Sequence, residues 1–256
     1  VWSIFEDTQK GLWVSTWNGL NHIRLQPEAF EVIGQPELHD PHVEALLLDK
    51  QGQIWAGTWA GLERLASSIG ERQLFELGEK SPDKGGRSAM GLSLLKADPG
   101  KLWVGTDELG LVQVDMETER SFMLARPDPQ LSFPVNVIYE DEAGTIWVGT
   151  PKGLFYWDAQ SDLTNDPPRK LSAPFQEVLE IVPDQQGKVW LGTPSGLFRF
   201  DVQSRKIEAI LPGYNIETIL NLGHKELWLG SNNLGLIKFN PVAQNQSVFT
   251  KEDGLP

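Results

Sequence analysis

The sequence predicts an all-β protein, a β-propeller of six four-stranded antiparallel blades, and three features predict it. Six tryptophans share a motif in which the Trp is followed by one apolar residue, then a small residue, then Thr or Ser. They are Trp13, Trp55, Trp103, Trp147, Trp190 and Trp228. A Gly-Leu pair follows each Trp after a short gap, and a segment of mostly apolar residues begins twelve residues before it. Because the three features keep their register in all six copies, they indicate a repeated structural unit.

Each repeat has the pattern of four short strands. In the first repeat we expect strands at Val1–Glu6, Leu12–Thr16, Leu20–Leu25 and about Phe30–Ile33. Several repeats carry an Asp and a Gly in the turn before the Trp strand, as in Asp141…Gly144. These residues suit a tight hairpin, because Asp accepts bonds from the turn backbone and Gly tolerates positive φ. Consecutive apolar residues in the first strands predict sheets that are buried on both faces.

The repeat length selects the architecture. Successive tryptophans are 42, 48, 44, 43 and 38 residues apart, which is the period of a four-stranded propeller blade. Leucine-rich and ankyrin repeats are shorter, and helical arrays need a helical periodicity that the sequence lacks. We therefore expect one propeller domain over residues 1–256, with the tryptophans packed between blades at about 1–40, 41–87, 88–134, 135–175, 176–213 and 214–256.

Composition limits the function classes. The chain has 35 acidic against 22 Lys and Arg residues, a net charge of −13, which argues against a nucleic-acid-binding surface. The absence of Cys excludes disulfides, thiolate metal sites and cysteine nucleophiles. The sequence contains no run of 18 apolar residues, so it predicts no membrane-spanning helix. Because the chain begins directly in a strand pattern and ends in an inter-blade linker, we expect it to be part of a longer array.

The segment Asp141–Leu154 reads D-x-x-G-x-I-W-V-G-T-x-x-G-L, and it resembles the repeat of the two-component regulator propeller (Reg_prop) family. The terminal Asp253-Gly254-Leu255-Pro256 resembles the linker into a further repeat of that kind. WD40 repeats fit less well, because their Gly-His and Trp-Asp signatures are missing.

The resemblance implies a periplasmic sensor domain of an inner-membrane receptor, with a kinase or diguanylate cyclase as output domain in the full-length protein. It also implies a small polar ligand such as an oligosaccharide and a possible homodimer. Family members commonly carry more repeats, arranged as two propellers, and an output domain, whereas this chain has six repeats and no such domain.

The repeated residues have structural explanations. We expect Gly57, Gly105, Gly149, Gly192 and Gly230 to allow close backbone approach, and the following Thr or Ser to bond to the turn or the neighbouring blade. Function should therefore lie in residues that do not repeat, on the face where the turns after the Trp strands meet the inter-blade linkers. These turns carry Trp17, Trp59, Asp107, Pro151, Pro194 and Asn232.

Trp17 and Trp59 stand at matching points of adjacent blades, where two aromatic faces could stack on sugar rings; the alternative is that they simply pack on their loops. The linkers add polar and aromatic residues: His39, Asp40, His42, Arg87, Phe133, Asn136, Gln176, Tyr214 and Asn215. Arg87 would pair with a carboxylate or sulfate of a ligand. The predicted ligand-binding residues are Trp17, Trp59, His42, Arg87, Asn136 and Tyr214.

Other functions have weaker support. His39-Asp40-Pro41-His42 contains metal-ligand residue types but no recognised ligand spacing. A streptogramin-lyase-like enzyme would need a His and Glu base pair that does not stand out among four His. A protein-docking scaffold is the other alternative. We therefore predict no catalytic residue, metal or cofactor, and no nucleic-acid partner.

Overall fold

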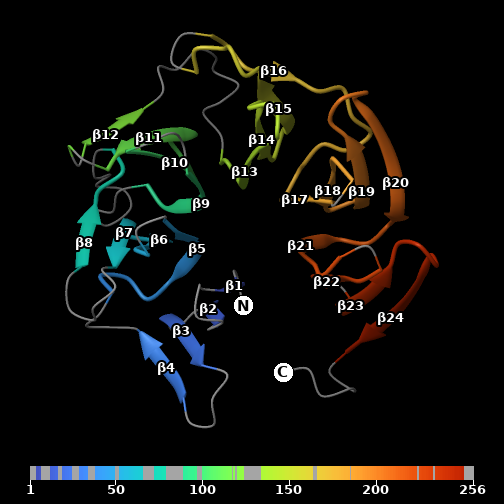
Figure 1. The fold of residues 1–256 in the computed structure, drawn as a ribbon, viewed down its shortest axis with the longest axis horizontal. Coiled ribbons are helices and arrows are strands. Elements are labelled where there is room, and N and C mark those ends of the chain that lie inside the picture. The colour runs from blue at the N-terminus through green and yellow to red at the C-terminus, as the bar shows by residue number, and fades with distance from the viewer. Residues whose placement is uncertain are drawn as a thin grey trace. The chain divides into compact units, whose positions relative to one another are not determined.

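The computed structural model contains only β-structure in the residues that it describes. These are residues 4–6, 12–16, 19–24, 29–33, 38–49, 52–65, 72–78, 89–96, 100–116, 118, 120–123, 134–163, 166–184, 186–223, 225–232 and 234–250; side chains of 4–33, 72, 96 and 120–123 are not described. Their strands form six four-stranded sheets in which every pairing is antiparallel and follows chain order (Figure 1). The chain divides into two compact units, residues 1–135 and 136–256.

The first unit contains three of the sheets. Their strands are β1 (Ile4–Glu6), β2 (Leu12–Thr16), β3 (Gly19–Arg24) and β4 (Ala29–Ile33); β5 (Val43–Leu48), β6 (Ile54–Thr58), β7 (Gly61–Leu65) and β8 (Arg72–Phe75); and β9 (Gly91–Lys96), β10 (Lys101–Thr106), β11 (Leu111–Asp115) and β12 (Arg120–Met123). The strands expected in the first repeat are found within a few residues of their predicted ends, apart from residues 1–3, which lie outside the described part.

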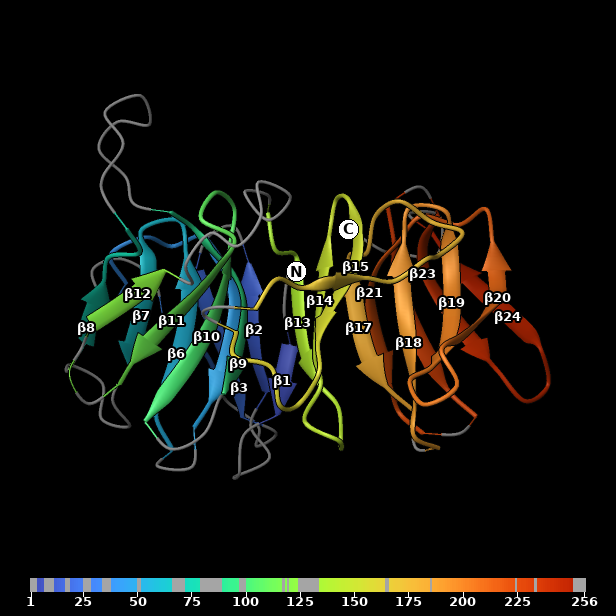
Figure 2. The same ribbon diagram turned by 90° about the horizontal axis from the view of Figure 1, so that it is seen from above.

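The second unit contains the other three sheets. Their strands are β13 (Val137–Glu140), β14 (Ile146–Thr150), β15 (Gly153–Trp157) and β16 (Arg169–Lys170); β17 (Glu180–Pro183), β18 (Lys188–Thr193), β19 (Gly196–Asp201) and β20 (Lys206–Pro212); and β21 (Ile216–Asn221), β22 (Leu227–Ser231), β23 (Gly235–Asn240) and β24 (Asn245–Phe249). Figure 2 shows β17 to β20 side by side within this unit.

The Asp-Gly turns form as the sequence predicts. Asp141 Oδ1 accepts hydrogen bonds from the backbone N–H groups of Ala143 and Thr145, at 3.0 and 2.9 Å. Its other oxygen accepts the indole N–H of Trp147 at 2.9 Å. Gly144 has a φ of 80°, a conformation that costs glycine little. One carboxylate therefore closes the hairpin and orients the Trp of the next strand.

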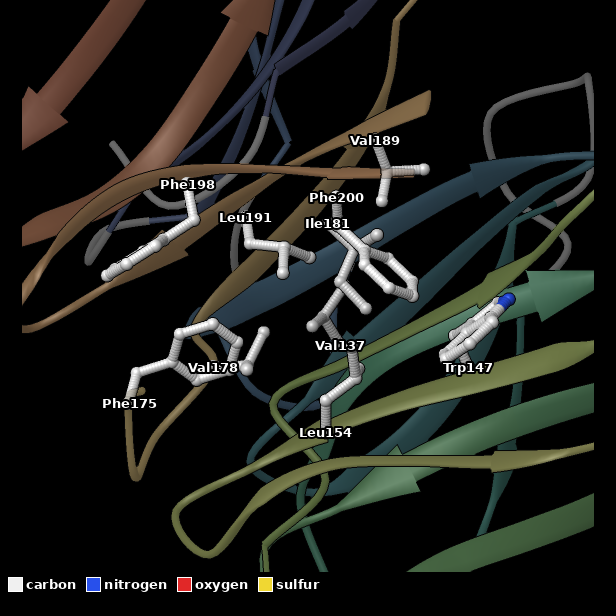
Figure 3. Packing of buried hydrophobic residues seen from close by; sticks show 10 residues of the cluster. All are labelled: Val137, Trp147, Leu154, Phe175, Val178, Ile181, Val189, Leu191, Phe198 and Phe200. Atoms are coloured by element: carbon white, nitrogen blue, oxygen red, sulfur yellow. The ribbon is translucent and has the colours of Figure 1, made fainter. Parts of the chain in front are cut away.

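The repeated tryptophans pack against the next sheet in the chain within each unit. Trp147 is 1% exposed and shares a core with Val189, Leu191 and Phe200 of β18 and β19 (Figure 3). Its ring meets that of Phe200 edge-on, with the centroids 5.0 Å apart. Trp55 packs in the same way against Leu102 of β10 and other residues of that sheet. The predicted packing of Trp between neighbouring sheets is confirmed at these positions.

The glycine that follows several of the repeated tryptophans allows neighbouring sheets to approach. A Cβ on Gly57 would lie 2.5 Å from the backbone oxygen of Gly91 in the next sheet. A Cβ on Gly149 would lie 2.9 Å from Cγ1 of Val178, just ahead of β17. Since these separations are below any normal contact, only glycine fits at either position. The predicted close backbone approach is confirmed at Gly57, whereas side chains take the space at Gly149.

The threonine after that glycine bonds to its own turn. Thr58 Oγ1 donates to the carbonyl of Gly61 at 3.2 Å and accepts the N–H of Ala60. Matching bonds from hydroxyl to turn carbonyl occur at Thr106, Thr150 and Thr193. Of the two partners expected for these hydroxyls, the turn is therefore the one observed in all four.

No helix of the described residues is long and apolar enough to cross a membrane.

Candidate functional site

The linker that precedes a sheet and the turn between its second and third strands lie at the same end of the sheet. The N–H of Trp59, at the turn, donates to the carbonyl of His42, in the linker, at 3.3 Å. The same bond joins Asp107 to Met90, and Asn232 to Asn215. Non-repeated residues from two separate segments thus meet at one end of each of these sheets.

At this end of the second sheet, residues of the linker, the turn and the first strand form a cluster of four. It consists of Asp40, His42, Glu44 and Trp59, and we call it the His42 cluster. The rings of His42 and Trp59 stack with their centroids 4.1 Å apart and their planes at 14°. The indole N–H of Trp59 donates to Glu44 Oε1 at 2.9 Å. Glu44 was not among the residues predicted from the sequence, because its pairing depends on the turn folding back onto the first strand.

Asp40 orients the imidazole of the cluster. Its Oδ1 accepts the backbone N–H of His42 at 2.9 Å and lies 2.7 Å from His42 Nδ1. A carboxylate at Nδ1 favours the tautomer that carries the proton on that nitrogen. The side chains of His42 and Asp40 are 28% and 16% exposed, so solvent reaches the cluster while its geometry is held by hydrogen bonds.

Asn136 and Tyr214 lie in the second unit, at its first and third sheets. Asn136 Nδ2 donates to the carbonyl of Val178 at 3.0 Å, a bond that links one sheet to the next. The hydroxyl of Tyr214 accepts a hydrogen bond from Gln246 Nε2 at 2.7 Å. These contacts give both side chains a partner within the unit.

Of the six predicted ligand-binding residues, His42 and Trp59 are in direct contact. Trp17 and Arg87 lie outside the described residues, so the predicted pairing of Trp17 with Trp59 stays a prediction. At the turn position of Trp59, the other described sheets carry Asp107, Pro151, Pro194 and Asn232. Asn232 repeats the pairing of Trp59, since its Nδ2 donates to Glu217 Oε1 at 2.6 Å.

The chemistry of the His42 cluster combines an aromatic surface with hydrogen-bond acceptors. Two carboxylates, Asp40 and Glu44, border the stacked rings. Such an arrangement suits a ligand with an apolar face and hydroxyl or amine donors at its edge. In the part of the chain that the structure describes, no three His, Asp or Glu side chains are grouped as metal ligands would be.

Comparisons with known proteins extend this description. A model of the two component regulator propeller family matches residues 37–60 and 134–152. The first of these segments includes His42 and Trp59, and the second includes Asn136 and Trp147. No curated protein matches the chain.

Solved structures share the fold. The extracellular domain of a hybrid two component system from B. thetaiotaomicron matches with a TM-score of 0.75 at 20% identity, over 97% of this chain and 34% of that chain. The corresponding domain of a second such system from the same bacterium has a TM-score of 0.62 at 18% identity, over 95% of this chain and 40% of that chain. This chain thus spans between a third and a half of the length of these two structures.

An enzyme also has this fold. Virginiamycin B lyase from Staphylococcus aureus matches with a TM-score of 0.70 at 14% identity, over 96% of this chain and 82% of that chain. Since the fold hosts both kinds of protein, the function has to be argued from the site.

Proposed function

Because the chain carries repeats of the two component regulator propeller family, we propose that it is a ligand-binding sensor domain of a bacterial signal-transduction receptor. In this proposal the six sheets are the blades of one propeller over residues 1–256. The domain is periplasmic, performs no catalysis, and passes its signal to a kinase or cyclase domain elsewhere in the full-length protein. Its ligand is a small polar molecule such as an oligosaccharide.

The observation that supports the proposal is the His42 cluster. The stacked rings of His42 and Trp59 are partly exposed, and an aromatic ring of this kind can pack against the C–H face of a sugar. The carboxylates of Asp40 and Glu44 can accept bonds from hydroxyl groups at the edge of that sugar. Trp17, Arg87, Asn136 and Tyr214 remain in the proposal as further ligand contacts.

A thermal-shift screen tests this function. The chain is heated with neutral, amino, uronic-acid and sulfated oligosaccharides, and one class should raise the melting temperature. A ligand present at 100 times its Kd stabilises the folded state by about 2.7 kcal/mol. The variant Trp59→Ala should weaken binding of the selected oligosaccharide about tenfold, which equals about 1.4 kcal/mol.

The matched control is Pro194→Ala, because Pro194 is exposed at the same turn position of another sheet. This variant should bind the oligosaccharide as the wild type does. If Trp59→Ala also binds with unchanged affinity, the His42 cluster is not the site. If none of the four classes shifts the melting temperature, direct oligosaccharide sensing is wrong.

A second candidate function is protein docking, which is favoured by apolar side chains exposed on the last sheet. Leu220 is 48% exposed, Leu222 59% and Val242 67%, and a partner could cover such apolar side chains. Light scattering over a range of concentrations should then show a dimer, and Leu222→Glu should shift it to the monomer. A monomer at every concentration would contradict a homodimer on this surface.

A lyase is the remaining alternative, and the hydrogen-bonded Asp40–His42 pair favours it, because a general base needs an oriented imidazole. Incubation with virginiamycin B, followed by chromatography, would reveal turnover. Loss of that turnover in His42→Ala would assign it to this pair, whereas an unaltered substrate excludes this particular activity.

A further inference from the structure

Glu63 breaks the pattern of the repeat at a buried position. It is the residue after the Gly-Leu pair of the second repeat, on β7. The same position is apolar and buried in the other four sheets whose side chains are described, where it is occupied by Val112, Phe155, Phe198 and Ile237. The side chain of Glu63 is 0% exposed. A carboxylate therefore stands where the sheet elsewhere accepts a hydrophobic residue.

Four polar groups surround this carboxylate. The backbone N–H of His39 donates to both oxygens, at 3.1 and 3.0 Å, and that of Asp40 donates to Oε1 at 3.3 Å. His39 Nδ1 lies 3.0 Å from Oε2, and Thr58 Oγ1 lies 3.4 Å from Oε1. All except the Thr58 hydroxyl belong to the linker that precedes β5. Glu63 thus bonds this linker to the interior of its sheet.

Packing of the sheet alone does not require such a carboxylate. Burying a charged group is costly unless hydrogen bonds compensate it, and Val, Phe or Ile fills the position in the other four sheets whose side chains are described. What Glu63 adds is a fixed conformation of residues 39 and 40. Asp40 in turn holds the ring and the N–H of His42.

We infer that Glu63 is a positioning residue that fixes the linker so that Asp40 orients His42 against Trp59. The inference rests on the proposed function only for the use of this geometry in ligand recognition. Glu63 contacts the linker backbone rather than the stacked rings, so it acts through Asp40 and His42. Through these contacts Glu63 organises the loops of the second sheet for binding.

The test uses the whole chain labelled with 5-fluorotryptophan, and no ligand. The ¹⁹F resonance of Trp59, assigned with Trp59→Phe, reports the stacking of its ring, and resonances of buried tryptophans such as Trp147 report the fold. His42→Ala calibrates the shift caused by loss of the stack. Amide hydrogen exchange of His39 and Asp40 reports the linker.

In Glu63→Val, we expect the Trp59 resonance to move toward its position in His42→Ala, with the Trp147 resonance unchanged. The amides of His39 and Asp40 should exchange at least about tenfold faster, which corresponds to about 1.4 kcal/mol of lost protection. Glu63→Gln keeps one acceptor but turns an amide NH₂ toward the donors, so it should cause a smaller shift of the same kind. Ile237→Val, at the matching position of the last sheet, should change neither readout.

An unmoved Trp59 resonance in Glu63→Val overturns the inference. Should that variant fail to fold, Glu63→Gln decides, and an unmoved resonance there overturns it as well. The readouts are independent of any ligand. Displacement of Trp59 together with a negative oligosaccharide screen would therefore support the positioning role while refuting direct oligosaccharide sensing.

Discussion

At the scale of single residues, a missing methyl group sets the distance between neighbouring sheets. At Gly57, Gly105, Gly149 and Gly192 the Cα faces residues at or just ahead of the next sheet, and the space for a Cβ is already taken. What occupies that space differs among repeats. At Gly57 it is a backbone carbonyl, whereas at Gly149 it is the side chains of Val137 and Val178. Backbone has less freedom to move than a valine methyl group, so the two positions should differ in tolerance.

We predict that Gly57→Ala is more destabilising than Gly149→Ala. Overpacking typically costs about 1–3 kcal/mol, and Gly57→Ala should reach the upper end of that range because the carbonyl of Gly91 would be 2.5 Å away. Denaturant unfolding followed by far-UV circular dichroism measures both variants. Equal loss of unfolding free energy in the two variants would contradict this reasoning.

At the scale of the element, three of the described hairpins are closed by an Asp side chain that reaches its own turn backbone. Asp141 accepts three hydrogen bonds, two from the turn backbone and one from the indole of Trp147. Asp49 and Asp184 cap their turns in the same way, with Gly52 and Gly187 at φ of 78° and 72°.

We predict that Asp141→Ala lowers the free energy of unfolding by about 2–3 kcal/mol, because three donors lose a charged acceptor. The control is Glu142→Ala, an exposed change in the same turn, which should stay within about 0.5 kcal/mol of the wild type. Thermal unfolding compares the two variants. A similar small loss in both would mean that the carboxylate of Asp141 is not what closes the hairpin.

The sequence predicts elements of this kind well, since they depend on neighbours in the chain. The Asp-Gly turns, the four strands per repeat and the glycine contacts all follow from a spacing of residues that recurs from repeat to repeat. The contacts of the candidate site residues, in contrast, join residues that are distant in the sequence. The bond from Trp59 to Glu44 joins positions 15 residues apart, and the bond from Asn136 to Val178 joins two sheets. Such pairs depend on side-chain directions that the periodicity leaves open.

Glu63 had a usable signal in the sequence. Aligning the Gly-Leu pairs puts a charged residue where four of the five other repeats are apolar and the first has the uncharged Asn21. Its partners could not be predicted, because the linker of residues 38–42 has no counterpart with the same residues elsewhere in the chain. The sequence therefore shows that Glu63 is unusual, whereas its bonds to the linker become visible only in the structure.

At the scale of the whole molecule, the chain is acidic, with a net charge of −13. We therefore consider how the titration of carboxylates changes the free energy of unfolding with pH. Burial raises the pKa of Glu180 from its ordinary value of 4.5 to about 7, and hydrogen bonds from Thr218 and the Ile181 backbone lower it only in part. Between these two values the folded chain keeps a proton that the unfolded chain has released. Raising the pH through this window therefore favours unfolding.

We predict that the contribution of Glu180 to the free energy of unfolding decreases as the pH rises from about 4.5 to about 7 and is constant above that. Glu180→Gln removes this titration, so the variant should gain stability relative to the wild type over that interval. Chemical denaturation at several pH values measures the difference. Glu208→Gln, an exposed change on β20, is the control, and an identical pH profile in all three proteins would contradict the role of Glu180.

The threonine bonds described above have a consequence for how such a chain diversifies. Thr58, Thr106, Thr150 and Thr193 each tie their hydroxyl to the glycine carbonyl on the far side of the turn. The tip residue between them takes no part in that closure, and it is Trp59 in one copy, Asp107 in another and proline in two more. The residue at the tip of one turn can therefore be substituted, by evolution or by grafting, to change binding specificity. The hydrogen bond that closes the turn keeps its geometry.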